Sequence, residues 1–177
     1  QKIIVLNKLG EYTEHAESIS YFNKVLEIDP NNAFAIEWLG WKYQLMGKWK
    51  ECSYYLRKAY KINPKDDFLY PIGGCLLEIG KYKDAIFYLE KALTKESKDS
   101  DVLGSIIASI GTAHLHIGNN EQAIIEFKKA LKIEPDNQVA LFNLNIAELS
   151  CGKTKTLKVN DKFDNVHFIK SDDELKN

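Results

Sequence analysis

The sequence has almost no arginine and no excess of charge of either sign. Of its 24 basic residues only Arg57 is an arginine, and 25 acidic residues leave a formal net charge of −1. Bidentate recognition of phosphate usually uses several arginines, and non-specific nucleic-acid binding needs a dominant positive charge. We therefore expect no nucleic-acid partner. No apolar run approaches the roughly 18 residues that a membrane span requires, so we predict no span in these residues.

Cysteine is scarce and odd in number. Cys52, Cys75 and Cys151 lie far apart in apolar surroundings, whereas disulfide frameworks of small secreted domains are dense and even-numbered. We therefore predict three reduced core thiols, a pattern that leans towards an intracellular (cytoplasmic) protein and leaves the compartment open. The chain begins at Gln1 without methionine, so we expect a processed or excised piece of a longer protein.

Signatures of catalysis and of metal binding are absent or incomplete. Gly152-Lys153-Thr154 ends like a P-loop, but Ala147 stands where the first glycine is required. His114 and His116 are two residues apart, and side chains at that spacing on a helix point in different directions. We therefore predict that the chain is not an enzyme and holds neither a cofactor nor a metal.

A repeat organises most of the chain. The stretches KVLEIDPNN (24–32), KAYKINPKD (58–66), KALTKESKD (91–99) and KALKIEPDN (129–137) align with one another, and each follows an aromatic-rich amphipathic segment. A dipeptide of an aliphatic residue and glycine recurs upstream, with another glycine seven residues later: Leu39-Gly40 with Gly47, Ile72-Gly73 with Gly80, and Ile110-Gly111 with Gly118. The period is near 34 residues and lengthens in the third unit through four extra residues around 100–103.

Within each unit the apolar residues recur at steps of three and four, as one buried face of a helix requires. Small residues such as Gly40 and Ala59 allow neighbouring helices to approach closely, and Pro64 and Pro135 end helices. One such unit cannot bury its own apolar face, so the units must stack.

These residues resemble the tetratricopeptide repeat, a helix–turn–helix unit. The second unit matches at Ile36, Leu39, Gly40, Tyr43, Gly47, Cys52, Leu56, Ala59 and Pro64. The fourth unit matches at Ile107, Ile110, Gly111, Gly118, Ala123, Phe127, Ala130 and Pro135, and the third has Ser97 where proline is usual. The resemblance implies an all-α fold, a right-handed α-solenoid with a concave inner surface, and a scaffold that binds proteins.

We place the units at 1–32, 33–65, 66–103 and 104–137, with a capping helix at 138–152 and a tail at 153–177. The first unit is a partial match: only its second helix has good form, and Gly10, taken as its turn glycine, is off the spacing. In the third unit Pro71, Gly73 and Gly74 fall inside the first helix, so we predict that this helix begins late, near Tyr70. The result is either a shortened helix or a widening of the groove.

The first helix of the second unit has a second apolar stripe, Phe34, Trp38, Trp41 and Leu45, which the family's geometry turns towards the groove. The alternative is that Trp38 or Trp41 packs against the preceding unit. The resemblance carries the lining of the groove to further units, and the candidate peptide-binding residues are Phe34, Trp38, Trp41, Leu45, Tyr70, Leu77, His116, Phe142 and Asn143. We expect an extended or helical peptide with hydrophobic anchors, oriented by His116 and Asn143.

Some tetratricopeptide co-chaperones hold the acidic C-terminus of heat-shock chaperones with a clamp of lysine, asparagine and arginine. The matching positions here are Glu37, Trp38, Trp41, Tyr70, Pro71 and Thr112, none of them a cation. A terminal carboxylate would find no charged partner there, so we do not expect that ligand.

The tail 153–177 leaves the repeat and carries isolated apolar residues in a nearly balanced set of charges. It is open to three interpretations: a linker, a strand, or a segment docked on the last helix or in the groove. A second function also stays open, in which the apolar stripe serves self-association or docks the chain within a larger protein.

Overall fold

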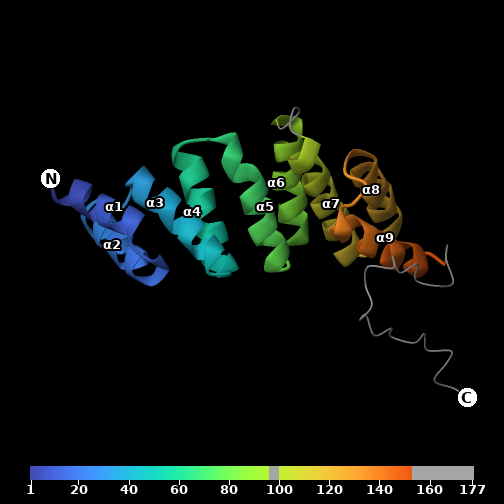
Figure 1. Cartoon of the computed structure of the whole chain (residues 1–177), viewed down its shortest axis with the longest axis horizontal. Helices are drawn as coiled ribbons and strands as arrows, with labels where there is room; N and C mark the ends of the chain where they lie inside the picture. The colour runs from blue at the N-terminus through green and yellow to red at the C-terminus, as the bar shows by residue number, and fades with distance from the viewer. Residues whose placement is uncertain (96–99, 153–177) are drawn as a thin grey trace, which may run out of the picture.

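The computed structural model describes residues 1–95 and 100–152, and the predictions made for the tail and for Ser97 lie outside them (Figure 1). Its helices form a row of antiparallel pairs without a strand in the described part of the chain. They are α1 (Lys2–Tyr12), α2 (His15–Ile28), α3 (Ala33–Leu45), α4 (Trp49–Ile62), the 3-10 helix η1 (Asp66–Phe68), α5 (Leu69–Glu78), α6 (Tyr82–Lys95), α7 (Ser100–His116), α8 (Asn120–Ile133) and α9 (Gln138–Ser150).

The pairs stack so that each second helix lies between two first helices. α2 packs on α1 and α3, and α4, α6 and α8 repeat this arrangement. First helices also touch one another, α1 with α3, α5 with α7, and α7 with α9, whereas no comparable contact joins two second helices among the described residues. The layer whose members touch lies on the inside of a curved stack, so the first helices line the concave side. The predicted all-α solenoid is confirmed.

Glycine brings the two helices of each pair together. A Cβ atom on Gly40, Gly73 or Gly111 would come within 3 Å of the Leu56, Leu89 or Phe127 side chain. Such a distance is too short for carbon atoms, so each contact exists only because the glycine has no side chain.

The first unit has the same contact, because a Cβ atom on Gly10 would lie 2.7 Å from the Phe22 ring. The interpretation of Gly10 as a turn glycine is therefore wrong. Sixteen residues separate Gly40 from Leu56 but only twelve separate Gly10 from Phe22, so about one helical turn is missing from the end of α1. Both helices of this unit form, and Leu9-Gly10 is the same dipeptide as Leu39-Gly40.

The other first helices end at a glycine with positive φ, at Gly47, Gly80, Gly118 and Gly152. α1 lacks this glycine and is capped by Thr13, whose backbone is extended and whose hydroxyl donates to the Leu9 carbonyl at 2.8 Å. The Lys42 ammonium from the next unit donates to the Thr13 carbonyl at 3.4 Å. The Thr13 hydroxyl and the Lys42 ammonium thus bond to carbonyl groups at the end of α1 that have no partner within the helix.

The third unit departs from the others at its start. Helix α5 begins at Leu69, which confirms the late start, and Pro71 lies in its first turn, where proline is tolerated. The 3-10 helix η1 occupies the preceding residues, and its buried Phe68 lies 5.9 Å from the Trp41 ring. α3 and α5 approach each other less closely than other neighbouring first helices do, so η1 fills a wider step between the second and third units. The four extra residues lengthen α7, which begins at Ser100 rather than 104.

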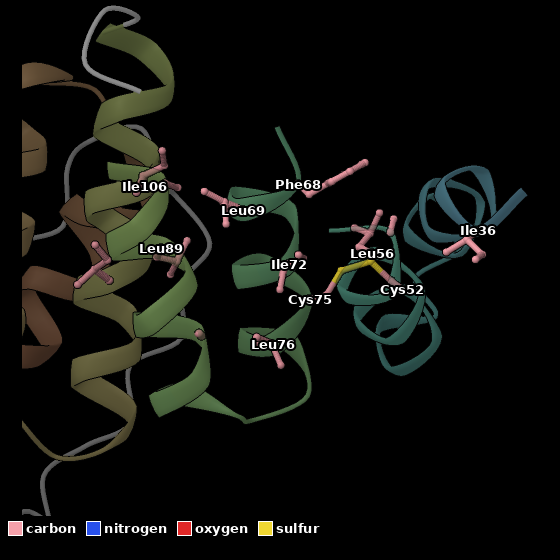
Figure 2. Packing of buried hydrophobic residues seen from close by; sticks show 14 residues of the cluster. Ile36, Cys52, Leu56, Phe68, Leu69, Ile72, Cys75, Leu76, Leu89 and Ile106 are labelled. Carbon is pink, nitrogen blue, oxygen red and sulfur yellow. A yellow bond between two sulfur atoms is a disulfide. The ribbon is translucent and has the colours of Figure 1, made fainter. Parts of the chain in front are cut away.

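A disulfide joins the second unit to the third at this same place. Figure 2 shows the bond between Cys52 of α4 and Cys75 of α5, whose Cα atoms are 6.4 Å apart in the buried cluster around Ile72. The prediction of reduced thiols is therefore wrong for this pair, because stacking of α4 on α5 joins positions 23 residues apart. Cys151 is a free, partly exposed thiol. The leaning towards an intracellular protein loses this support.

Candidate peptide-binding groove

The apolar stripe of α3 divides into exposed and packed residues. Leu45 is 70% exposed, and Phe34 is exposed on the first-helix layer with one edge contact, 6.2 Å between its ring and that of Phe22. Trp38 lies partly buried against the preceding unit, stacked 6.3 Å from the Phe22 ring. Trp41 lies partly buried against Phe68 of η1. The two tryptophans thus pack between units, and the exposed apolar surface of α3 is formed by the residues at its two ends.

Behind the groove, Tyr43 of α3 stacks on Tyr55 of α4 at 5.5 Å. Burial raises the pKa of both hydroxyls, and the negative charge of Glu51 raises it further. Both side chains therefore stay neutral at physiological pH and act in packing the pair.

The middle of the candidate groove is lined by small or half-buried side chains. Tyr70 and Leu77 of α5 are partly buried against the core, and a Cβ atom on Gly74 would meet nothing within 4 Å. The hydroxyls of Ser109 and Thr112 on α7 donate to carbonyls of their own helix. The side chains named here are therefore small or already packed, and the two hydroxyls are engaged within α7.

At the far end Phe142 of α9 is 47% exposed, with Val139 exposed beside it. Asn143 donates from its amide nitrogen to the Thr112 hydroxyl at 3.2 Å, so it ties α9 to α7. His116 is exposed at the end of α7 and stacks on Tyr82 with ring centroids 4.7 Å apart. The polar residues predicted for orientation are thus both held by neighbours.

Charge differs sharply between the two layers. From α3 onward the first-helix layer carries one basic residue, Lys42, against six acidic ones: Glu37, Asp66, Asp67, Glu78, Asp101 and Glu148. Lys42 is buried, with its ammonium over the Trp38 ring, and the nearby Lys65 pairs with Glu37 at 2.8 Å. By contrast α4, α6 and α8 carry ten basic and five acidic residues. The described first helices from α3 to α9 thus carry more acidic than basic residues, although Glu37 and Glu148 are paired with Lys65 and Lys128.

Sequence reasoning missed an apolar face on α1. Val5 and Leu9 are exposed and Tyr12 is 82% exposed. Their equivalents thirty residues later, Ala35, Leu39 and Lys42, are buried beneath α2. Matching of Leu9-Gly10 with Leu39-Gly40 would have identified these positions. α1 therefore presents the surface of an internal repeat, which in the later units a second helix covers.

Neither a metal site nor a membrane helix stands out in the described residues. No three His, Cys, Asp or Glu side chains there are arranged to hold a metal ion. None of the described helices has both the length and the apolarity needed to cross a membrane.

Comparison with known sequences identifies the repeat. The family model of subunit 3 of the anaphase-promoting complex, cyclosome, matches residues 11–92, and a tetratricopeptide-repeat model matches 105–137. The Protein CTR9 homolog of Arabidopsis thaliana is 33% identical over 125 residues, or 70% of this chain and 11% of that protein. Tetratricopeptide repeat protein 8 of Caenorhabditis elegans is 28% identical over 150 residues, or 84% of this chain and 29% of that protein. The chain thus spans less than a third of these relatives.

Solved structures share the fold at low identity. The crystal structure of MamA superposes with a TM-score of 0.74 at 21% identity, covering 85% of this chain and 83% of that one. YrrB, described as a tetratricopeptide protein with an unusual peptide-binding site, superposes with a TM-score of 0.70 at 21% identity, covering 87% and 78%.

Proposed function

Since this chain belongs to the tetratricopeptide-repeat family, we propose that it is a protein-interaction module that binds a peptide or a helix in its concave groove. The observation that carries the proposal is the exposure of large apolar side chains on the first-helix layer, at both ends of the groove. They are Phe34 and Leu45 on α3, and Val139 and Phe142 on α9. We infer that the chain works by binding and is not itself an enzyme.

The exposed anchors suit a ligand that carries apolar side chains at two separated places. Full burial of one side chain such as Leu45 or Phe142 contributes about 1.5–3 kcal/mol. Between the anchors the open space at Gly74 lets a main chain lie close to α5. An extended peptide meets both conditions, because it spans several helices with alternating side chains.

The tryptophans have a different role in this proposal. Trp38 and Trp41 bridge neighbouring units through Phe22 and Phe68, so they set the spacing of the helices that present the anchors. Substitution of either would change the shape of the groove together with its surface, and the test below therefore uses exposed residues.

The test is affinity capture from a lysate of the source cells with the double variant Leu45→Ser/Phe142→Ser. We expect the partners that wild type holds to bind the variant at least tenfold more weakly, because both anchors are lost.

The matched control is Tyr54→Ser/Phe87→Ser, which removes two equally exposed aromatic residues from the second helices α4 and α6. It should retain the partners. If the groove variant and the control capture the same set as wild type, binding through this groove is wrong.

The apolar face of α1 favours a second candidate, self-association of the chain. Two copies that bring Val5, Leu9 and Tyr12 together would bury the surface that α2 buries on α3. We expect the apparent mass in sedimentation velocity to rise with concentration. The variant Leu9→Glu/Tyr12→Glu should dissociate at least tenfold more readily. If the wild-type mass stays that of a monomer at every concentration measured, self-association is contradicted.

A further inference from the structure

The candidate groove combines apolar ends with an acidic middle. Asp67 and Glu78 of the third unit stand thirty-three residues after Phe34 and Leu45, at the same places in the repeat, and both are exposed. No unpaired cation balances them on the described first helices from α3 onward. A ligand with apolar anchors and lysines near them therefore fits this groove better than an acidic one.

The outer layer has the opposite character. On α4, Arg57, Lys58 and Lys61 line one shallow hollow together with Tyr54. Lys91 of α6 lies over the exposed Phe87 ring at 4.5 Å. A lysine-rich segment would thus meet like charge on the second helices, and electrostatics selects the groove for it.

The chain itself contains such a segment, directly after α9. Residues 153–163 read KTKTLKVNDKF, with four lysines, one acidic residue and the apolar residues Leu157, Val159 and Phe163. The acidic residues of the tail are concentrated after this stretch. Its lysines are complementary to the acidic residues of the groove, and its apolar residues are complementary to the apolar anchors.

The segment also starts at the correct rim. The first helices run in the same direction, so the C-terminal ends of α3, α5, α7 and α9 share one rim, where Leu45, Glu78 and His116 lie. Packed helices are about 8–10 Å apart, so Glu78 is about 20 Å from the end of α9. About six extended residues span that distance, and Lys158 is the sixth residue after Gly152.

We propose that residues 153–169 occupy the concave groove of their own chain and compete there with the partner peptide. This inference rests on the proposed function of the groove. The apolar side chains of the segment cover the anchors of α9, and its lysines pair with Glu78 and Asp67. A partner must then displace a tethered competitor, whose effective concentration is in the millimolar range.

The first test is carbodiimide cross-linking of the full-length chain, which joins a lysine ammonium to a carboxylate only when the two are in contact. We expect amide bonds between Lys158 and Glu78, with a yield that falls severalfold in 0.5 M salt. Isotope-labelled and unlabelled chains are mixed, so that links between copies are recognised. Links only to second helices, only within the tail, or only between copies would overturn the proposal.

The second test measures binding of a fluorescent peptide of residues 153–169 to the full-length chain. The variant Lys155→Glu/Lys158→Glu should release the tethered segment and bind the peptide at least tenfold more tightly than wild type does. The control Lys170→Glu/Lys176→Glu lies outside the segment and should bind as wild type does. Equal affinity in all three proteins would contradict occupation of the groove.

The two proposals fail in different ways. If Leu45→Ser/Phe142→Ser loses its lysate partners but no groove cross-links form, the groove binds a partner and the tail inference is wrong. If the cross-links form while that variant keeps its partners, the segment occupies the groove, but the proposed function is wrong and the competition with a partner peptide is wrong with it.

Discussion

Reduction of the Cys52–Cys75 disulfide is expected to lower the free energy of unfolding by about 3 kcal/mol. The bond closes a loop between cysteines 23 residues apart, and the loss of chain entropy in the unfolded state at that length has this magnitude. Both sulfur atoms are buried at the step between the second and third units. The bond therefore supports the place where α3 and α5 approach each other less closely than other neighbouring first helices do.

The measurement is denaturant unfolding of the same protein, oxidised and reduced. Variant Cys151→Ala is the control, because it removes the free thiol and leaves the cross-link in place; its response to reduction should equal that of wild type. Alkylation of the denatured, unreduced protein should modify one thiol. Modification of three thiols, or equal stability of the two forms, would show that the bond is absent or without effect.

Replacing either of two neighbouring glycines of α5 by alanine is expected to change the stability of the protein, but in opposite directions. Gly73→Ala should destabilise the protein by about 1–2 kcal/mol, because the new Cβ would lie 2.6 Å from two carbon atoms of the buried Leu89 side chain. Gly74→Ala should stabilise it by up to about 1 kcal/mol, because its Cβ meets no atom within 4 Å and alanine favours the helix.

Each variant is the control for the other, since both make the same change in the same helix. The measurement is the midpoint of denaturant unfolding at an unchanged slope. Equal shifts in the two variants would mean that the approach of α6 to α5 does not depend on Gly73. A loss of partner binding by Gly74→Ala alone would add support to a ligand main chain passing that point.

Local patterns were enough to predict the repeated fold. The spacing of Leu39-Gly40 and Ile110-Gly111 fixes which face of each first helix is buried, and proline near Tyr70 predicts the late start of α5. These inferences succeed because the same interactions recur about every 34 residues, so the pattern in one unit predicts the structure of the next. The first helix of the first unit was not recognised as a full repeat helix, because the missing turn after Gly10 changes the spacing between Gly10 and the second helix.

The candidate groove was predicted only in part. The sequence shows that α3 is apolar on two faces, but not which apolar residues a neighbouring unit covers. Trp38 and Trp41 bind adjacent units, while Leu45 and Phe142 are left exposed. The α1 face was missed for a related reason, since exposure of Leu9 and Tyr12 depends on the absence of a covering helix among the described residues.

The amino-acid sequence by itself determined the helices, their order and the stacking of the pairs, because hydrophobic periodicity, glycine contacts and proline act within one unit or between adjacent units. Only the tertiary structure decided the Cys52–Cys75 pairing, the wider step at η1 and the division of the apolar stripe. These depend on the distance and rotation between units. Such quantities arise from the packing of whole side-chain surfaces, and no short pattern in the chain encodes them.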